Sequence, residues 1–185
     1  MNDITLPYKL LIFDWDGTLM DSTARIAQTL AQALEDVRMP KRPLQERRDV
    51  IGLGLDEAML QLAPAATDAQ REQLVERYRH HWLKPEAPIT HLFAGVAEAL
   101  VTLQQQGYWL AVATGKSRAG LDRSMIECGL PKNLFVATRT ADETRSKPNP
   151  QMLEELLEET GLDEAMRFNG AGSNDAEALL DSIYD

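Results

Sequence analysis

The chain has a single cysteine, no long apolar run and no large cluster of basic residues. Cys128 is the only cysteine, so no disulfide can form within the chain, which fits a reducing compartment. No apolar stretch approaches the roughly 20 residues that span a bilayer. The N-terminus also lacks the basic-then-apolar layout of a signal peptide. We therefore expect a soluble, cytoplasmic protein.

The charge balance argues against polyanionic partners. The chain carries 19 basic and 29 acidic side chains, a net charge of -10. Basic residues occur only in short pieces such as Lys41-Arg42 and Arg47-Arg48. Nucleic acid and anionic membranes need neutralised phosphates, so we expect neither as a partner. Hydrophobic residues make up 44% of the chain, which is enough for a sizeable core.

Strand patterns alternate with helical ones over most of the chain. Helical stripes lie between the strands and end at Gly107, Gly129 and Gly161, as expected for left-handed C-caps. The alternation predicts an α/β fold with a doubly wound, Rossmann-like parallel sheet. We expect its strands at residues 9–13, 108–113, 134–137 and, more weakly, 166–169.

The segment from Asp21 to His91 breaks this alternation. An amphipathic stripe from Ile26 to Val37 predicts a helix that begins after a Ser22 cap. A shorter helix is expected at residues 56–62, and capping-box spacing at residues 67–70 opens a helix that runs to Trp82. No strand pattern is present, so we predict a helical cap at residues 21–91, inserted into a core formed by residues 1–20 and 92–185.

The most informative motif is Asp14-Trp15-Asp16-Gly17-Thr18, directly after an apolar strand. Carboxylates two residues apart at a strand end point the same way, and Gly17 permits a sharp turn. This pattern suits a divalent metal and a phosphate, with one Asp free to attack phosphorus. An Asp-x-Asp pair by itself is often only a solvated turn, but the full five-residue motif is far more specific.

Two further segments carry phosphate chemistry. Thr114 and Gly115 follow a strand and would present a hydroxyl and backbone N–H groups to phosphate oxygens; alone, such a Thr is more often a helix cap. Lys147 precedes Pro148, which holds it in an extended stretch from which it can neutralise carboxylates. Alone, it would be taken for a surface lysine. The order of the three segments along the chain favours the functional interpretation.

In this order the segments resemble the signatures of the haloacid dehalogenase-like phosphatases, in their phosphoglycolate-phosphatase-like branch. The resemblance implies Mg²⁺-dependent hydrolysis of a small phosphomonoester, similar to phosphoglycolate, through an aspartyl-phosphate on Asp14. It implies that Asp16 shuttles the proton and that Thr114, Gly115 and Lys147 hold the phosphoryl group. A loop in the cap would close over the site and help to choose the substrate; its residues are Gly52, Leu53 and Gly54. The expected partner is a small phosphorylated metabolite, bound by a monomer or homodimer.

The fourth signature departs from the family pattern. The resemblance implies metal ligation by Asp14, by the backbone carbonyl of Asp16 and by Asp175. Ala171 stands where a further carboxylate is expected, and its side chain cannot coordinate Mg²⁺. By the same resemblance about 30 more residues would follow, the size of a βαβ unit. We therefore expect reduced activity that recovers partly at high Mg²⁺.

Two alternative functions stay open. A phosphomutase would use the same scaffold to move a phosphoryl group rather than to release it. A catalytically impaired member would bind a phosphate ligand or a partner without turnover, in keeping with Ala171. A receiver-like phospho-acceptor is disfavoured, because such domains lack an inserted helical cap.

Overall fold

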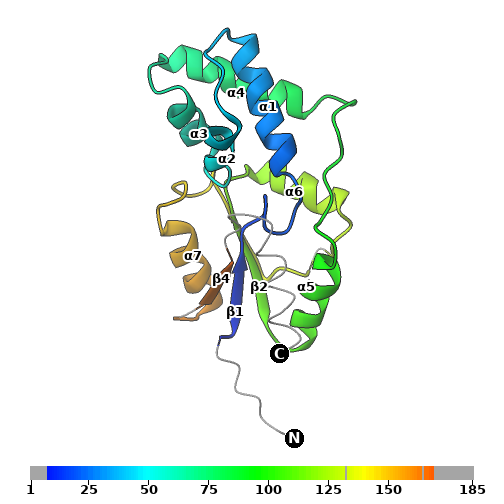
Figure 1. Cartoon of the computed structure of the whole chain (residues 1–185). Helices are drawn as coiled ribbons and strands as arrows, with labels where there is room; N and C mark the ends of the chain where they lie inside the picture. The colour runs from blue at the N-terminus through cyan, green and yellow to red at the C-terminus, as the bar shows by residue number, and fades with distance from the viewer. Residues whose placement is uncertain (1–7, 132, 164, 169–185) are drawn as a thin grey trace, which may run out of the picture.

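The computed structural model describes residues 8–131, 133–163 and 165–168. Its strands form a parallel sheet in the order β3-β2-β1-β4 (Figure 1). All three pairings are parallel, which confirms the α/β prediction. The strands are β1 (Leu10–Phe13), β2 (Trp109–Thr114), β3 (Ala137–Thr140) and β4 (Ala165–Phe168).

Strand β1 lies inside the sheet, between β2 and β4, and its four residues are all buried. Phe13 pairs with Val112, so β1 and β2 end at the same edge of the sheet. Asp14 directly follows Phe13, while Thr114 is the last residue of β2. Parallel register therefore brings Asp14 and Thr114, which are 100 residues apart in the sequence, to one edge of the sheet.

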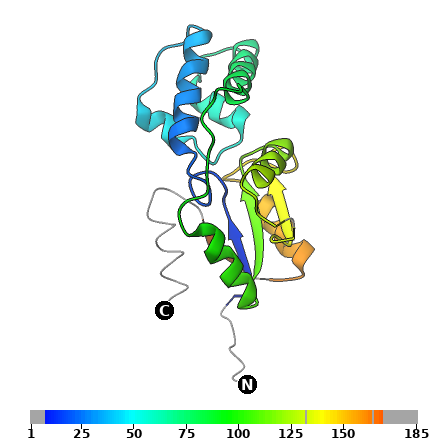
Figure 2. The same ribbon diagram turned by 90° about the vertical axis from the view of Figure 1, so that its right-hand side faces the viewer.

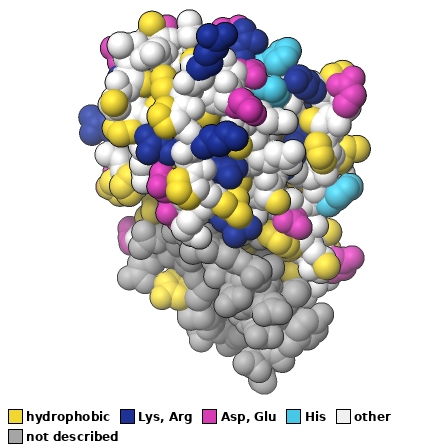
Figure 3. Space-filling model, turned by 45° about the horizontal axis from the view of Figure 1, so that its top comes forward, with side chains coloured by type: hydrophobic (Ala, Val, Ile, Leu, Met, Phe, Trp, Pro, Cys, Tyr) yellow, Lys and Arg dark blue, Asp and Glu magenta, His cyan; other side chains and the backbone are white. Residues whose placement is uncertain are grey.

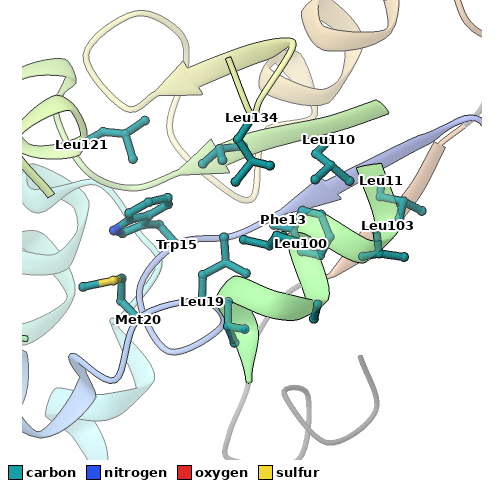
Figure 4. Close-up of a cluster of buried hydrophobic side chains, with 13 residues drawn as sticks. Leu11, Phe13, Trp15, Leu19, Met20, Leu100, Leu103, Leu110, Leu121 and Leu134 are labelled. Atoms are coloured by element: carbon teal, nitrogen blue, oxygen red, sulfur yellow. The ribbon is translucent and has the colours of Figure 1, made fainter. Parts of the chain in front are cut away.

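Helices cover both faces of the sheet, as Figures 1 and 2 show. On one face, α5 (Val96–Gln105) and α6 (Arg118–Glu127) bury a cluster that includes Phe13, Trp15 and Leu110. Figure 4 shows Leu100 and Leu103 of α5 directed at Phe13 and Leu11 of β1. On the other face, α7 (Gln151–Thr160) packs Met152 and Leu156 against Ile12 and Ala111.

The remaining described helices lie beyond the carboxyl end of the sheet (Figure 1). They bury a separate hydrophobic cluster that includes Leu30, Met59 and Leu74, so this segment has a core of its own. Thr67 and Gln70 form the capping box that their spacing predicts. The four helices are α1 (Thr23–Asp36), α2 (Leu44–Asp49), α3 (Leu55–Leu62) and α4 (Asp68–Trp82).

Two features differ from the sequence-based expectations. The strand expected at residues 134–137 begins only at Ala137 and runs to Thr140. Leu134 is instead a loop residue buried in the core, so the apolar run marks burial rather than strand pairing. Helix α2 was not expected, because none of its residues is buried and it carries no apolar stripe.

The helical end of the molecule, formed by α1 to α4 and the loops between them (residues 23–82), carries mixed charge on its surface. Figure 3 shows Lys and Arg side chains spread among acidic, hydrophobic and uncharged ones on this face. None of the helices in the described part of the chain is both long and apolar enough to cross a bilayer.

Candidate active site

Asp14 lies at the carboxyl end of β1 and is 4% exposed. Lys147 Nζ is 3.0 Å from Asp14 Oδ1, so the loop before α7 reaches the end of β1, as the sequence predicts. Burial raises the pKa of Asp14 above its usual 3.8, although the Lys147 ammonium opposes this shift. A buried carboxylate with a single ammonium partner is a place where further positive charge stabilises the ionised form.

Asp16 is 8% exposed and has two partners. Ser22 Oγ donates a hydrogen bond to Asp16 Oδ1 at 2.7 Å, and Lys116 Nζ lies 3.0 Å from Asp16 Oδ2. Ser22 does precede α1, but its side chain makes no capping hydrogen bond, so that part of the expectation was wrong. The hydroxyl binds the carboxylate instead, because hydrogen bonds to ionised groups are the stronger ones.

The second motif supplies a residue that the sequence analysis missed. Thr114 is 1% exposed, and its Oγ1 accepts a hydrogen bond of 3.2 Å from the Lys116 N–H. This turn directs the Lys116 side chain to Asp16. The run Thr-Gly-Lys after a strand was the available signal, because a lysine two residues beyond the strand end can reach the neighbouring strand end.

The loop Gly52-Leu53-Gly54 lies directly on these residues. A Cβ added at Gly52 would be 3.5 Å from Asp14 Oδ2, and one added at Gly115 would be 2.2 Å from the Leu53 carbonyl oxygen. The Gly54 N–H donates a hydrogen bond of 2.7 Å to Ser146 Oγ. The missing Cβ at Gly115 therefore allows the loop to close against the sheet edge.

Aromatic and basic side chains meet where the helical end joins the sheet. The Arg25 guanidinium lies 3.9 Å from the centre of the Trp82 ring, and Lys116 Nζ lies 5.0 Å from the same centre. Tyr78 stacks on Trp82 with ring centres 5.9 Å apart, and burial raises the pKa of its hydroxyl. No local pattern in the sequence relates these residues.

The oxygen donors near the end of β1 have the chemistry that Mg²⁺ prefers. Asp14 Oδ1 is buried and lies 3.0 Å from Lys147 Nζ, and the two oxygens of a carboxylate have further lone pairs that could bind a cation. No group of three His, Cys, Asp or Glu side chains with metal-site geometry occurs within the described residues. Ala171 and Asp175 lie outside those residues. The part of the site formed by Asp14 and Asp16 fits the metal.

Residues 11–170 match the model of a family described as haloacid dehalogenase-like hydrolase. A probable phosphatase, IndB, from Dickeya dadantii (strain 3937) is 34% identical over 160 residues, which cover 84% of this chain and 69% of that protein. A phosphoglycolate phosphatase from Mannheimia succiniciproducens is 31% identical over 178 residues, covering 91% of this chain and 79% of that protein.

A solved structure agrees with these matches. The crystal structure of a predicted phosphoglycolate phosphatase from Haemophilus somnus 129pt has a TM-score of 0.76 and 25% sequence identity, and the match covers 88% of this chain and 77% of that one. The residues matched by the family model include Asp14, Thr114 and Lys147.

Proposed function

We propose that this chain, which belongs to the haloacid dehalogenase-like hydrolase family, is a phosphatase that hydrolyses small phosphomonoesters through a phosphorylated Asp14. One observation carries the proposal. Two buried carboxylates at one sheet edge are each paired with a lysine from a different loop, Asp14 with Lys147 and Asp16 with Lys116. Such an arrangement places a nucleophile, a proton carrier and positive charge around one small volume.

In the first step, a carboxylate oxygen of Asp14 attacks phosphorus, and the bond from phosphorus to the ester oxygen breaks. Asp16 in its protonated form gives a proton to the departing oxygen, which leaves as an alcohol. Lys147 neutralises charge on the phosphoryl oxygens, while Thr114 and Gly115 orient them. The Ser22 hydroxyl fixes the Asp16 side chain through its 2.7 Å hydrogen bond.

In the second step, water attacks the phosphorus of the aspartyl-phosphate. Asp16, now ionised, takes a proton from that water, the bond from phosphorus to Asp14 breaks, and inorganic phosphate leaves. The loop of Gly52, Leu53 and Gly54 would exclude bulk water during the first step, since it lies on Asp14 and a dry site strengthens each electrostatic contact.

Asp14, the Asp16 backbone carbonyl and Asp175 would hold Mg²⁺. The ion would supply screening of the negative charge on the transferring phosphoryl group. Because Ala171 offers no carboxylate, we propose weak Mg²⁺ binding, with activity that rises at high Mg²⁺. We further propose that residues 21–91 act as one cap, and that the chain works as a monomer or homodimer in the cytoplasm on a phosphoglycolate-like metabolite.

The proposal is tested by measuring phosphate release from a panel of small phosphomonoesters at increasing Mg²⁺. Asp14→Asn should abolish release. Asp21→Asn, the same chemical change at an exposed position nearby, should not affect it. Equal release by the wild type and Asp14→Asn would leave the chain as a phosphate-ligand binder without turnover. An isomerised sugar phosphate in place of free phosphate would identify a mutase.

A further inference from the structure

We propose that a cavity between α1, α4 and residues 84–88 binds a small divalent oxyanion, at a site separate from the sheet edge where the phosphoryl group would be transferred. The cavity has a volume of about 240 Å³, and Asp14, Asp16 and Lys147 are not among the residues that line it. Helices α1 and α4 lie side by side (Figure 1), and the segment that follows α4 lines the same cavity. The lining residues that carry the inference are Arg25, Gln28, Gln32, His81, Lys84 and Glu86.

Arg25 brings to the cavity a half-buried charge that has no acidic partner. Within the described part of the chain, no carboxylate lies within ion-pair distance of its guanidinium, and its buried Nε has no hydrogen-bond partner. The guanidinium lies 3.9 Å from the centre of the Trp82 ring and donates a hydrogen bond of 2.7 Å to the Trp82 carbonyl oxygen. Desolvation lowers the pKa of Arg25, so an anion in the cavity would stabilise its charged form.

Lys84 brings the second charge, and a neutral histidine fixes its position. Lys84 Nζ lies 3.1 Å from His81 Nδ1, and because an ammonium only donates hydrogen bonds, that ring nitrogen is the acceptor. His81 Nε2 therefore carries the proton and donates to Asp36 Oδ2 at 2.8 Å. The His81 side chain is 10% exposed. Lys84 makes only this hydrogen bond with the described residues, which leaves two of its three N–H groups for a ligand.

The donors around the cavity suit an anion with several oxygens. The Arg25 guanidinium and the amides of Gln28 and Gln32 lie on α1, and the Lys84 ammonium lies on the segment after α4. About 240 Å³ is several times the roughly 30 Å³ that one water molecule occupies, so an ion of the size of sulfate or malonate has room. Glu86 is the one acidic residue among those that line the cavity. Two cations therefore face one carboxylate, which favours a bound anion over a bound cation.

The test follows the histidine ring signals by NMR while sodium sulfate or sodium malonate replaces sodium chloride at constant ionic strength. The His81 signal should shift and saturate, because His81 accepts a hydrogen bond from Lys84. Lys84→Met and Arg25→Met should each weaken binding at least about tenfold, as expected for the loss of a hydrogen bond to a charged group. Glu86→Gln should strengthen binding about two- to fivefold, because it removes an opposing, exposed charge.

Two further variants separate this cavity from the rest of the surface. Lys147→Met should leave the His81 response unchanged, because Lys147 does not line the cavity. Lys41→Met, which removes an exposed charge elsewhere on the helical end, should also have no effect. A saturable response to either anion supports the inference, and the tighter of the two anions identifies the preferred shape.

Three results would overturn the inference. They are a His81 signal that does not saturate with either anion, an unchanged affinity in both Lys84→Met and Arg25→Met, and a response that is lost in Lys147→Met. Thermal melting confirms that each variant is folded. None of these measurements needs turnover, so a failure here is distinct from a failure of the proposed function.

Discussion

The sheet edge and the helical end contribute different things to the site. At the sheet edge, Asp14 and Asp16 are buried and each is held by a lysine. The helical end contributes mostly backbone, through Gly52 and Gly54, together with the Trp82 ring and the cation that lies on it. The reactive groups are thus paired charges at the end of the sheet, and in the proposed mechanism the helical end supplies shape and closure.

If this division is correct, the largest effect should come from removing a charge at the sheet edge. Lys147→Met would leave the buried Asp14 carboxylate without its ion-pair partner. We expect kcat to fall at least about 10²-fold. Because Lys147 opposes the upward shift, the pKa of Asp14 should rise further, so the remaining activity should need a higher pH than that of the wild type.

The pH profile of kcat measures this effect directly. Lys9→Met is the control for loss of a lysine elsewhere, because Lys9 is an exposed residue whose ammonium donates to the Gly107 carbonyl oxygen away from the site. A Lys147→Met variant with the wild-type kcat and pH profile would show that the ion pair is structural only.

The next effect should come from preventing the helical end from closing. Gly115→Ala would place a methyl group 2.2 Å from the Leu53 carbonyl oxygen, so the loop must move off Asp14. We expect kcat/KM to fall about tenfold or more for every ester, because misplacement of this size is costly in a catalytic site. Gly120→Ala, whose nearest neighbour would be the Ser117 hydroxyl at 3.2 Å, is the control. Full activity in Gly115→Ala would disprove closure against this residue.

A smaller effect is expected from one hydrogen bond that joins the Gly52-Leu53-Gly54 loop to the loop before α7. Ser146→Ala removes the acceptor of the Gly54 N–H, and a neutral hydrogen bond contributes about 0.5–1.5 kcal/mol. KM should rise about three- to tenfold, with a smaller change in kcat. Steady-state kinetics checks this against Thr102→Ala, which removes an exposed hydroxyl from α5. Equal effects of the two substitutions would show that the loop is held by other contacts.

The smallest effect is expected on the free energy of unfolding, from an ion pair that lies outside the site, between Arg118 and Glu143. Arg118 and Thr140 hold the pKa of Glu143 below its usual 4.5. A carboxylate with a lowered pKa stabilises the fold above its ordinary pKa and loses that contribution as pH falls through the lowered value. Glu143→Gln should therefore reduce the free energy of unfolding at pH 7 by no more than about 1 kcal/mol, since the pair is partly exposed.

Denaturant unfolding at several pH values tests this prediction. The difference between Glu143→Gln and the wild type should shrink as the pH falls below 4.5. A difference that is constant with pH would mean that Glu143 acts by packing rather than by charge.

The sequence predicts most of the residues that meet at the sheet edge, because local patterns determine where each strand ends. An apolar strand followed by Asp14, and another ending at Thr114, must meet at one edge once the sheet is parallel. The contacts of the helical end have no such local signal. Arg25 and Trp82 are 57 residues apart, and Gly54 and Ser146 are 92 apart. Ser22 illustrates the limit, since its position before a helix predicts a cap while the nearby carboxylate takes its hydroxyl.

The central claim is that the Asp14 carboxylate becomes phosphorylated during turnover. Quenching the enzyme with borohydride while it hydrolyses 2-phosphoglycolate would reduce an acyl phosphate to an alcohol, and mass spectrometry of the peptide containing Asp14 would detect it. If Asp14 is the nucleophile, homoserine will be found at position 14 and unmodified aspartate at position 16. Unmodified Asp14 in an enzyme that is turning over, or modification at another residue, would show that Asp14 is not the nucleophile.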